Sequence, residues 1–284
     1  MKYKLIITLF LACSSLMAQK VTDGDFRTID AQSGLNIARG KTTGMSVVHK
    51  FGAASDFDAA DGYVTVWDGA VDAPDIDAMQ YTYCVTACVD SVISSSASDT
   101  GTVELQGLGG NGALVIQSAT LNGQTRVGLA TNLWRVFRIK NTGATNFAGD
   151  VSAYVTNAPT SGGIPTDTSL IRAHVQAGNN QTLMAIYTIP TNKTGYVTGV
   201  YASSAGANKA NASIVRLFVR PQGGVFQLKH QASVIATGSS NIPRPFDIPL
   251  KVDGMSDIEV RANTDETGTG LSAWFDIILV DGIE

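Results

Sequence analysis

The sequence predicts an all-β protein with two antiparallel β-sandwich domains in tandem, preceded by an apolar leader and an extended N-terminal arm. Short segments of alternating apolar and polar residues recur along the chain, and 29 glycines mark many of the turns between them. Hydrophobic residues make up 44% of the 284 residues and charged residues only 15%, so there is enough apolar material for two cores. Strand spacing does not distinguish a jelly roll from an immunoglobulin-like sandwich, so both topologies stay open.

Residues 1–18 have the pattern of a secretory signal peptide. A basic start precedes an apolar run, and residues 16–18 form a cleavage-site sequence. Cys13 follows an imperfect lipobox, so lipidation is a weaker alternative, and an uncleaved apolar strand or helix is another. Residues 19–43 are polar and lack hydrophobic periodicity, which indicates an extended surface arm.

The first predicted domain covers residues 44–176. Its strands are short, alternate in hydrophobicity and are joined by glycine-rich turns, as in an antiparallel sandwich. The segment 157–169 is rich in Pro, Gly, Ser and Thr, which fits either an interdomain linker or a long hairpin loop. We favour the loop, because 170–176 has the pattern of a strand that returns to the first sheet. The predicted strands are 45–51, 63–67, 89–95, 102–108, 113–119, 125–130, 133–140, 149–156 and 170–176.

An acidic stretch in this domain holds the weak metal candidates Asp56, Asp58 and Asp61. Their spacing differs from that of an EF-hand, and the bidentate glutamate at its twelfth position is absent. Loop aspartates commonly initiate turns. We therefore expect no metal site and assign turn-forming roles to the three carboxylates.

Cys84 and Cys88 lie four residues apart. In a strand they would be about 13 Å apart, too far for a disulfide, so only a loop or helical turn could join them. We expect two small buried hydrophobic side chains unless the protein is exported. A zinc site would need two further ligands nearby, and the sequence shows none.

Charged and titratable residues give little support for catalysis or for nucleic-acid binding. The formal net charge is −4, which argues against a dense basic face. The three histidines are scattered over separate predicted strands, so we predict no catalytic residues and no cofactor. No apolar run is long enough for a membrane-spanning helix. The basic residues of 126–140 could form a patch, but they fit ordinary solvated strand faces better: Arg126, Arg135, Arg138 and Lys140.

The second predicted domain covers residues 177–284 and begins with a hairpin. The segments 181–189 and 195–201 are β-prone, and Pro190 ends the first of them. Alternation predicts one shared apolar face for Leu183, Ala185, Tyr187 and Ile189. Further strands are predicted at 212–219, 225–230, 246–252, 258–263 and 271–280, with Val215, Leu217 and Val219 facing the core.

The last predicted strand, 271–280, is apolar on both faces towards its end. A strand of this kind fits a position between a core and a second surface. We therefore predict that Trp274, Ile278 and Val280 contact another subunit or the first domain. The expected partners are further copies of the chain, with a trimer among the options, and other proteins of the same assembly.

The chain from about residue 37 to residue 282 resembles a family of virion structural proteins of tailed bacteriophages, and six segments carry the resemblance through their order along most of the chain. The cysteine segment 84–88 and the signal-like leader depart from the family pattern, since phage virions assemble in the host cytoplasm. The segments are GMSVVHKFG (44–52), VWDG (66–69), ISSSASDTGTVELQGL (93–108), LWRVFRIKNTG (133–143), QTLMAIYTIPTNKTGYVTG (181–199) and FDIILVDG (275–282).

The resemblance implies a non-enzymatic virion component, either a head decoration protein or part of a fibre or tail, located in the virion. The alternative is a secreted or lipid-anchored binding module for a glycan or a receptor. Its support is the leader together with the tryptophans and tyrosines, since aromatic rings stack on sugars as well as filling cores. Determining whether the natural protein keeps or loses its leader distinguishes the virion component from the secreted binding module.

Overall fold

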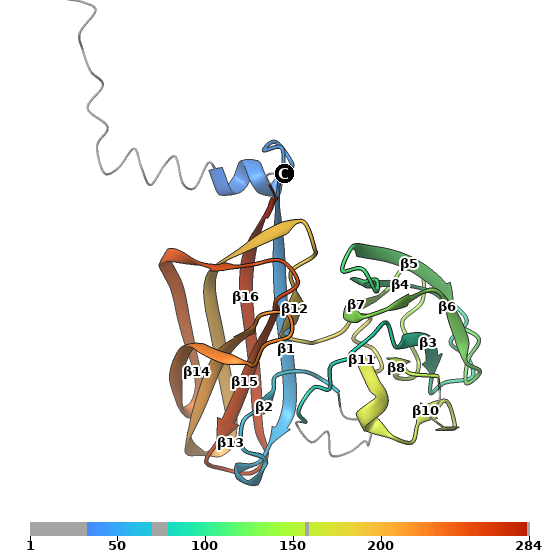
Figure 1. Ribbon diagram of the computed structural model, residues 1–284. Coiled ribbons are helices and arrows are strands. Elements are labelled where there is room, and N and C mark those ends of the chain that lie inside the picture. The colour runs from blue at the N-terminus through green and yellow to red at the C-terminus, as the bar shows by residue number, and fades with distance from the viewer. Residues whose placement is uncertain (1–32, 70–78, 157–158, 283–284) are drawn as a thin grey trace, which may run out of the picture. The chain divides into compact units, whose positions relative to one another are not determined.

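The computed structural model describes residues 33–69, 79–156 and 159–282, and at 205–211 and 235–244 it describes the backbone alone. Figure 1 shows an all-β fold, which confirms the predicted class. The chain divides into two compact units, residues 1–46 and 47–284. The predicted leader, and the part of the predicted arm before residue 33, lie outside the described residues.

A short helix at residues 33–38 lies in the smaller unit. The amide of Arg39 donates to the carbonyl of Leu35 at 3.0 Å, and Gly40 adopts a positive φ of 67° just after the helix. A glycine in this conformation ends many helices, because it lacks the Cβ that makes the left-handed region costly. The expectation of an extended arm is therefore wrong for 33–38, where local backbone hydrogen bonds stabilise a helix without hydrophobic periodicity.

A large β-sandwich is built from both ends of the unit 47–284. Its strands form one sheet in the order β1-β16-β13-β15-β12, with β14 paired to β13 and β2 paired to β15. The bounds are β1 (Met45–Phe57), β2 (Val64–Thr65), β12 (Ile186–Thr188), β13 (Lys193–Arg220), β14 (Gln227–Val252), β15 (Asp257–Thr264) and β16 (Thr269–Asp281).

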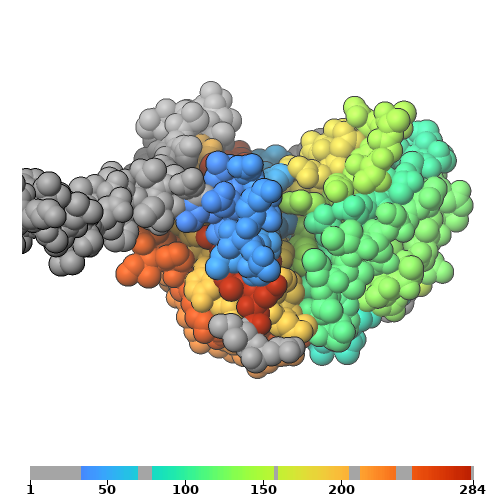
Figure 2. Space-filling model, turned by 90° about the horizontal axis from the view of Figure 1, so that it is seen from above, coloured from blue at the N-terminus to red at the C-terminus, as the bar shows by residue number. Residues whose placement is uncertain are grey.

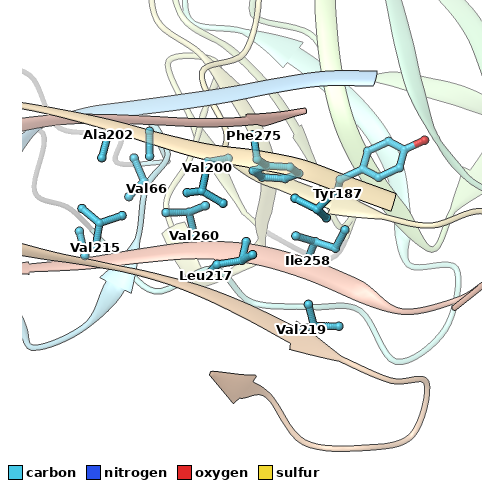
Figure 3. Packing of buried hydrophobic residues seen from close by; sticks show 14 of the residues in the cluster. Val66, Tyr187, Val200, Ala202, Val215, Leu217, Val219, Ile258, Val260 and Phe275 are labelled. Carbon is cyan, nitrogen blue, oxygen red and sulfur yellow. The ribbon is translucent and has the colours of Figure 1, made fainter. Parts of the chain in front are cut away.

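The long strand β13 contributes to both sides of this sandwich. Its first part, 193–205, pairs with β16, and its second part, 213–220, pairs with β15. The register with β14 shifts between Ala205 and Ala210, between these two parts. In Figure 3, Val200 and Ala202 of the first part lie across the core from Val215 and Leu217 of the second.

The core of the large sandwich confirms the predicted alternation on β13. Val215, Leu217 and Val219 are all buried in the apolar cluster, whereas the residues between them are partly exposed. Phe275 from β16 and Ile258 from β15 pack into the same cluster (Figure 3). Alternating side chains on a strand thus place one face in the core.

A smaller β-sandwich occupies residues 89–175. One sheet has the order β11-β8-β3-β6 and the other has the order β5-β4-β7. Figure 2 shows these residues, coloured teal to yellow-green, as one continuous block. Its strands are β3 (Val89–Ser94), β4 (Thr102–Leu108), β5 (Leu114–Thr120), β6 (Val127–Leu133), β7 (Arg135–Asn141), β8 (Val151–Tyr154) and β11 (Ile171–Val175), with a small hairpin of β9 (Thr160–Ser161) and β10 (Ile164–Pro165).

The smaller sandwich is inserted between β2 and β12 of the large one. β1 pairs with β16, and β2 pairs with β15 at Arg261 and Ala262. The structure thus places β1 and β2, which the predicted domain 44–176 included, in the sandwich formed by the C-terminal strands. Alternation within a strand shows which face is apolar but not which distant strand becomes its neighbour. The expected return of 170–176 to the first sheet is confirmed by the pairing of β11 with β8.

The predicted hairpin of 181–189 and 195–201 does not form. β12 pairs with β15, and β13 pairs with β14, β15 and β16. The segment 184–189 instead alternates between the two cores. Ala185, Tyr187 and Ile189 are buried in the large sandwich, as their predicted common face requires, whereas Met184 and Ile186 are buried in the small one.

Candidate functional site

A buried ion network centres on Asp257, the first residue of β15. Its carboxylate accepts hydrogen bonds from Arg135 Nε at 2.8 Å, from Arg220 Nη2 at 2.6 Å and from the hydroxyl of Thr188 at 2.6 Å. The side chains of Asp257 and Arg135 are 3% and 5% exposed. A buried carboxylate with this many donors is compensated for its lost hydration.

Glu259 extends the network two residues along β15. Its fully buried carboxylate accepts from Arg261 Nε at 2.9 Å and from Gln80 Nε2 at 2.8 Å. The hydroxyl of Tyr83 donates to the other carboxylate oxygen at 3.1 Å. Burial and the nearby carboxylates raise the pKa of Tyr83 well above its usual range, so this phenol keeps its proton.

Three aromatic rings border the arginines of this network. The guanidinium of Arg220 lies 4.3 Å from the Tyr83 ring centroid and 4.5 Å from that of Phe226. The guanidinium of Arg135 lies 3.8 Å from the Trp134 ring centroid. Cations over ring faces are attracted by the ring quadrupole, and such contacts also hold the side chains in one orientation.

A cavity of about 320 Å³ opens beside these groups. It is lined by residues of the network, by the segment 83–85 and by the turn 222–224 between β13 and β14. A volume near the lower end of the range for small-molecule sites suits a ligand the size of one small ring. We name this cavity the arginine pocket.

Cys84 and Cys88 form a disulfide in the loop that borders the arginine pocket, with their Cα atoms 5.9 Å apart. The expectation of two separate buried side chains is therefore wrong. Residues 81–88 are irregular, with a bend at 85–87, before β3 begins at Val89, so the cysteines approach closely instead of lying along a strand. The carbonyl of Cys84 accepts from Trp134 Nε1 at 3.0 Å and from Arg135 Nη1 at 2.7 Å, which fixes the loop to the pocket.

A second cavity, of about 290 Å³, is lined by Asp68 among mostly small residues. Burial raises the pKa of Asp68 to about 7, although His174 and the amide of Leu183 lower it in part. His174 Nε2 lies 3.7 Å from the Asp150 carboxylate. Burial lowers the pKa of His174, but Asp150 and Asp68 outweigh burial and the net shift is upward. Sequence reasoning missed this trio because its members lie on separate elements.

Lys50 is a buried cation on β1. Its ammonium donates to the backbone carbonyl of Phe137. Burial, with repulsion from Arg138, lowers the pKa of Lys50 well below its usual range. Among the four basic residues assigned to solvated strand faces, Arg135 is buried, so the assignment is wrong there, where the carboxylate of Asp257 compensates the charge.

The predicted interface residues share the outer face of β16. Trp274, Ile278 and Val280 are partly exposed and alternate with buried Phe275, Ile277 and Leu279. The Trp274 ring stacks on Tyr201 of the neighbouring strand, with centroids 5.5 Å apart and planes at 7°. Val47, on the adjacent strand β1, is 45% exposed. Asp276 lies between Trp274 and Ile278 on the same face. This assembly face, as we call it, is a mostly apolar, partly exposed row on β16.

Two of the three aspartates considered as metal ligands, Asp58 and Asp61, lie at a turn, whereas Asp56 lies in β1. Asp61 accepts from the amide of Asp58 at 2.9 Å, and Asp58 accepts from the amide of Gly268 at 3.1 Å. The contact between Asp58 and Asp61 belongs to a capping box at the start of the short 3-10 helix Ala59–Asp61. Within the described ranges, no three His, Cys, Asp or Glu side chains are grouped so that they could hold a metal ion.

The remaining histidines lie apart from the arginine pocket. His49 on β1 contacts Asp276 on the assembly face, and His230 lies on β14 against Phe246, with ring centroids 5.3 Å apart. In the part of the chain that the structure describes, no helix has the length and hydropathy of a membrane span.

Comparison with known proteins yields structural likenesses alone. No family model and no curated protein matches the chain. Among solved structures, the VP2 subviral particle of infectious bursal disease virus matches at 9% identity, over 84% of this chain and 72% of that chain, with a TM-score of 0.23. The T=1 particles derived from the same virus match at 10% identity, over 84% and 70%, with a TM-score of 0.24. At these scores the likeness carries no argument about function.

Proposed function

We propose that the chain is a non-enzymatic structural protein of a virion, a head decoration protein or part of a fibre or tail. It acts by packing against copies of itself and against other virion proteins through the assembly face. The observation that carries this proposal is the set of partly exposed apolar side chains Trp274, Ile278 and Val280, interrupted only by Asp276, on the outer face of β16. Exposed apolar patches on a folded domain commonly mark contacts with other proteins.

The buried ion network inside the protein supports a structural role. The buried charges Asp257 and Glu259 are bound to arginines and to hydroxyl or amide donors. Buried, fully bonded polar groups of this kind hold neighbouring strands in one arrangement. A rigid scaffold loses little conformational entropy when it joins an assembly, because its contact surface is already ordered.

The experiment is to purify the chain from residue 19 onwards and measure its mass by light scattering, with electron microscopy of the same sample. We expect a discrete oligomer or a repeating assembly. A monomer at every concentration tested would contradict the proposal. For the virion assignment, mass spectrometry of particles shed by the source culture should detect this chain, and its absence from all particles would argue against that location.

A second candidate function is a secreted or surface-anchored binding module. The Cys84–Cys88 disulfide favours it, since disulfides persist mainly in oxidising compartments. Mass spectrometry of the natural N-terminus tests this candidate directly. A supernatant protein that begins at Gln19, or one lipidated at Cys13, supports export, whereas a chain with its leader intact in particles supports the virion role.

A further inference from the structure

The arginine pocket carries one positive charge more than its own acids neutralise. Arg135 and Arg220 line it, and Asp257 is the single acidic residue among the lining side chains that the structure describes. The adjoining pair of Glu259 and Arg261 is balanced in itself. A singly charged anion would neutralise the pocket, whereas a phosphate monoester carries close to two charges at neutral pH.

The guanidinium of Arg220 is fixed in one orientation beside the pocket. Its Nε and Nη2 both donate to Asp257 Oδ2, at 2.9 and 2.6 Å, and its guanidinium lies against Tyr83 and Phe226. Nη1 has no hydrogen-bond acceptor within the described ranges, and the side chain is 24% exposed. A guanidinium fixed in this way offers planar N–H donors that match a carboxylate with little loss of side-chain entropy.

The rest of the pocket wall is aromatic and polar. Trp134 is partly exposed, and its orientation is fixed because Nε1 donates to the carbonyl of Cys84. Tyr83 forms a second ring surface, and Gln222 at the exposed turn adds an amide side chain at the mouth. Rings of this kind have an apolar body that packs on the C–H face of a sugar while the neighbouring polar groups bind hydroxyls.

We propose that the arginine pocket binds a carboxylate-bearing monosaccharide unit of an acidic glycan. The carboxylate pairs with the free edge of Arg220, and the sugar ring lies against the aromatic wall. This site is separate from the assembly face and does not depend on the function proposed for that face.

The test is an NMR titration of the full chain from residue 19 with sodium D-glucuronate, using D-glucose and acetate as matched probes. We expect glucuronate to bind at least about tenfold more tightly than glucose, which lacks the carboxylate that forms the charged hydrogen bonds. We expect a similar preference over acetate, which has the carboxylate but lacks the ring that packs on the aromatic wall. Arg220→Gln should weaken glucuronate binding by about tenfold or more. Gln222→Trp, an exposed change at the pocket mouth that keeps the network, should do the same by filling the entrance.

Arg216→Gln is the matched control. Arg216 lies on the same strand, over the ring of Tyr63 at 3.7 Å, and is bound to Gln231, but it does not line the pocket. It should leave glucuronate binding unchanged. Equal losses in Arg216→Gln and Arg220→Gln, or no binding up to the solubility limit of glucuronate, would overturn the proposal. Acetate binding as tightly as glucuronate would overturn the sugar assignment.

The proposed glycan site and the proposed assembly face can be tested independently of each other. A variant with Ile278→Ser and Val280→Ser changes the assembly face alone, so it should bind glucuronate as the unchanged chain does. Loss of glucuronate binding in this variant would show that the pocket depends on assembly and would contradict a self-contained site.

Discussion

The side chains of Arg135 and Asp257 form a buried ion pair with two hydrogen bonds, Nε to Oδ1 at 2.8 Å and Nη2 to Oδ2 at 3.2 Å, although 122 residues separate them in the sequence. Arg135 begins β7 of the small sandwich, and Asp257 begins β15 of the large one. The pair therefore ties the inserted sandwich to the strands that enclose it in sequence.

Replacing Asp257 with Asn should destabilise the protein by about 3–5 kcal/mol, because it leaves two arginines without their buried counter-charge. Urea unfolding followed by circular dichroism measures the change. Glu104→Gln is the control, since Glu104 pairs with Lys140 at 2.8 Å where the lysine is 39% exposed. An exposed pair should cost at most about 1 kcal/mol. Similar small losses in both variants would show that the buried pair adds little.

Replacing Tyr187 with Asp should lower the free energy of unfolding by several kcal/mol and unfold a marginal domain. Tyr187 is 4% exposed and its ring lies 4.6 Å from that of Phe137, so the new carboxylate would be buried among apolar groups. Thermal unfolding measures the effect. Tyr187→Phe keeps the ring and should change the stability by about 1 kcal/mol or less. An unchanged melting temperature for the Asp variant would contradict the burial of this side chain.

The stability of the protein should fall as the pH rises through the range set by Asp68. In the fold this carboxyl keeps its proton to about pH 7, whereas its ordinary pKa is 3.8, so between these values the folded state binds more protons than the unfolded state. The free energy of unfolding then decreases with rising pH. His174, with its raised pKa, acts in the same direction, and Lys50, with its lowered pKa, acts in the opposite one.

The variant Asp68→Asn isolates the contribution of Asp68, because the amide does not titrate. Urea unfolding at pH 5 and pH 8 should show a smaller loss of stability with pH in the variant than in the unchanged chain. An identical pH dependence in both would mean that Asp68 titrates as an ordinary exposed carboxyl.

Replacing both Ile278 and Val280 with Ser should weaken assembly more than folding. These side chains are partly exposed on the outer face of β16, so folding buries them less than the alternating inner residues. Light scattering should show a smaller mass, while the urea midpoint should change little. The matched inner change, Ile277→Ser, should instead destabilise the fold, because Ile277 is fully buried. Equal losses of assembly and stability in the outer variant would identify its residues as core.

The sequence by itself determined the all-β class and the common buried face of Val215, Leu217 and Val219. Each follows from alternation within one strand, which is a local property of the backbone. The loop-like composition of 157–169, followed by the strand pattern of 170–176, also predicted the return of 170–176 to the first sheet.

Only the tertiary structure decided which distant segments meet. It paired β1 with β16 and β12 with β15, and it joined Cys84 to Cys88 in a loop. It also brought Arg135 to Asp257, and His174 to Asp150. The physical reason is that strand partners and buried counter-charges are chosen by long-range packing, which a single-strand pattern does not encode. From the sequence alone, Arg135 is assigned to a solvated strand face, because its carboxylate partner Asp257 lies on a strand of another sheet.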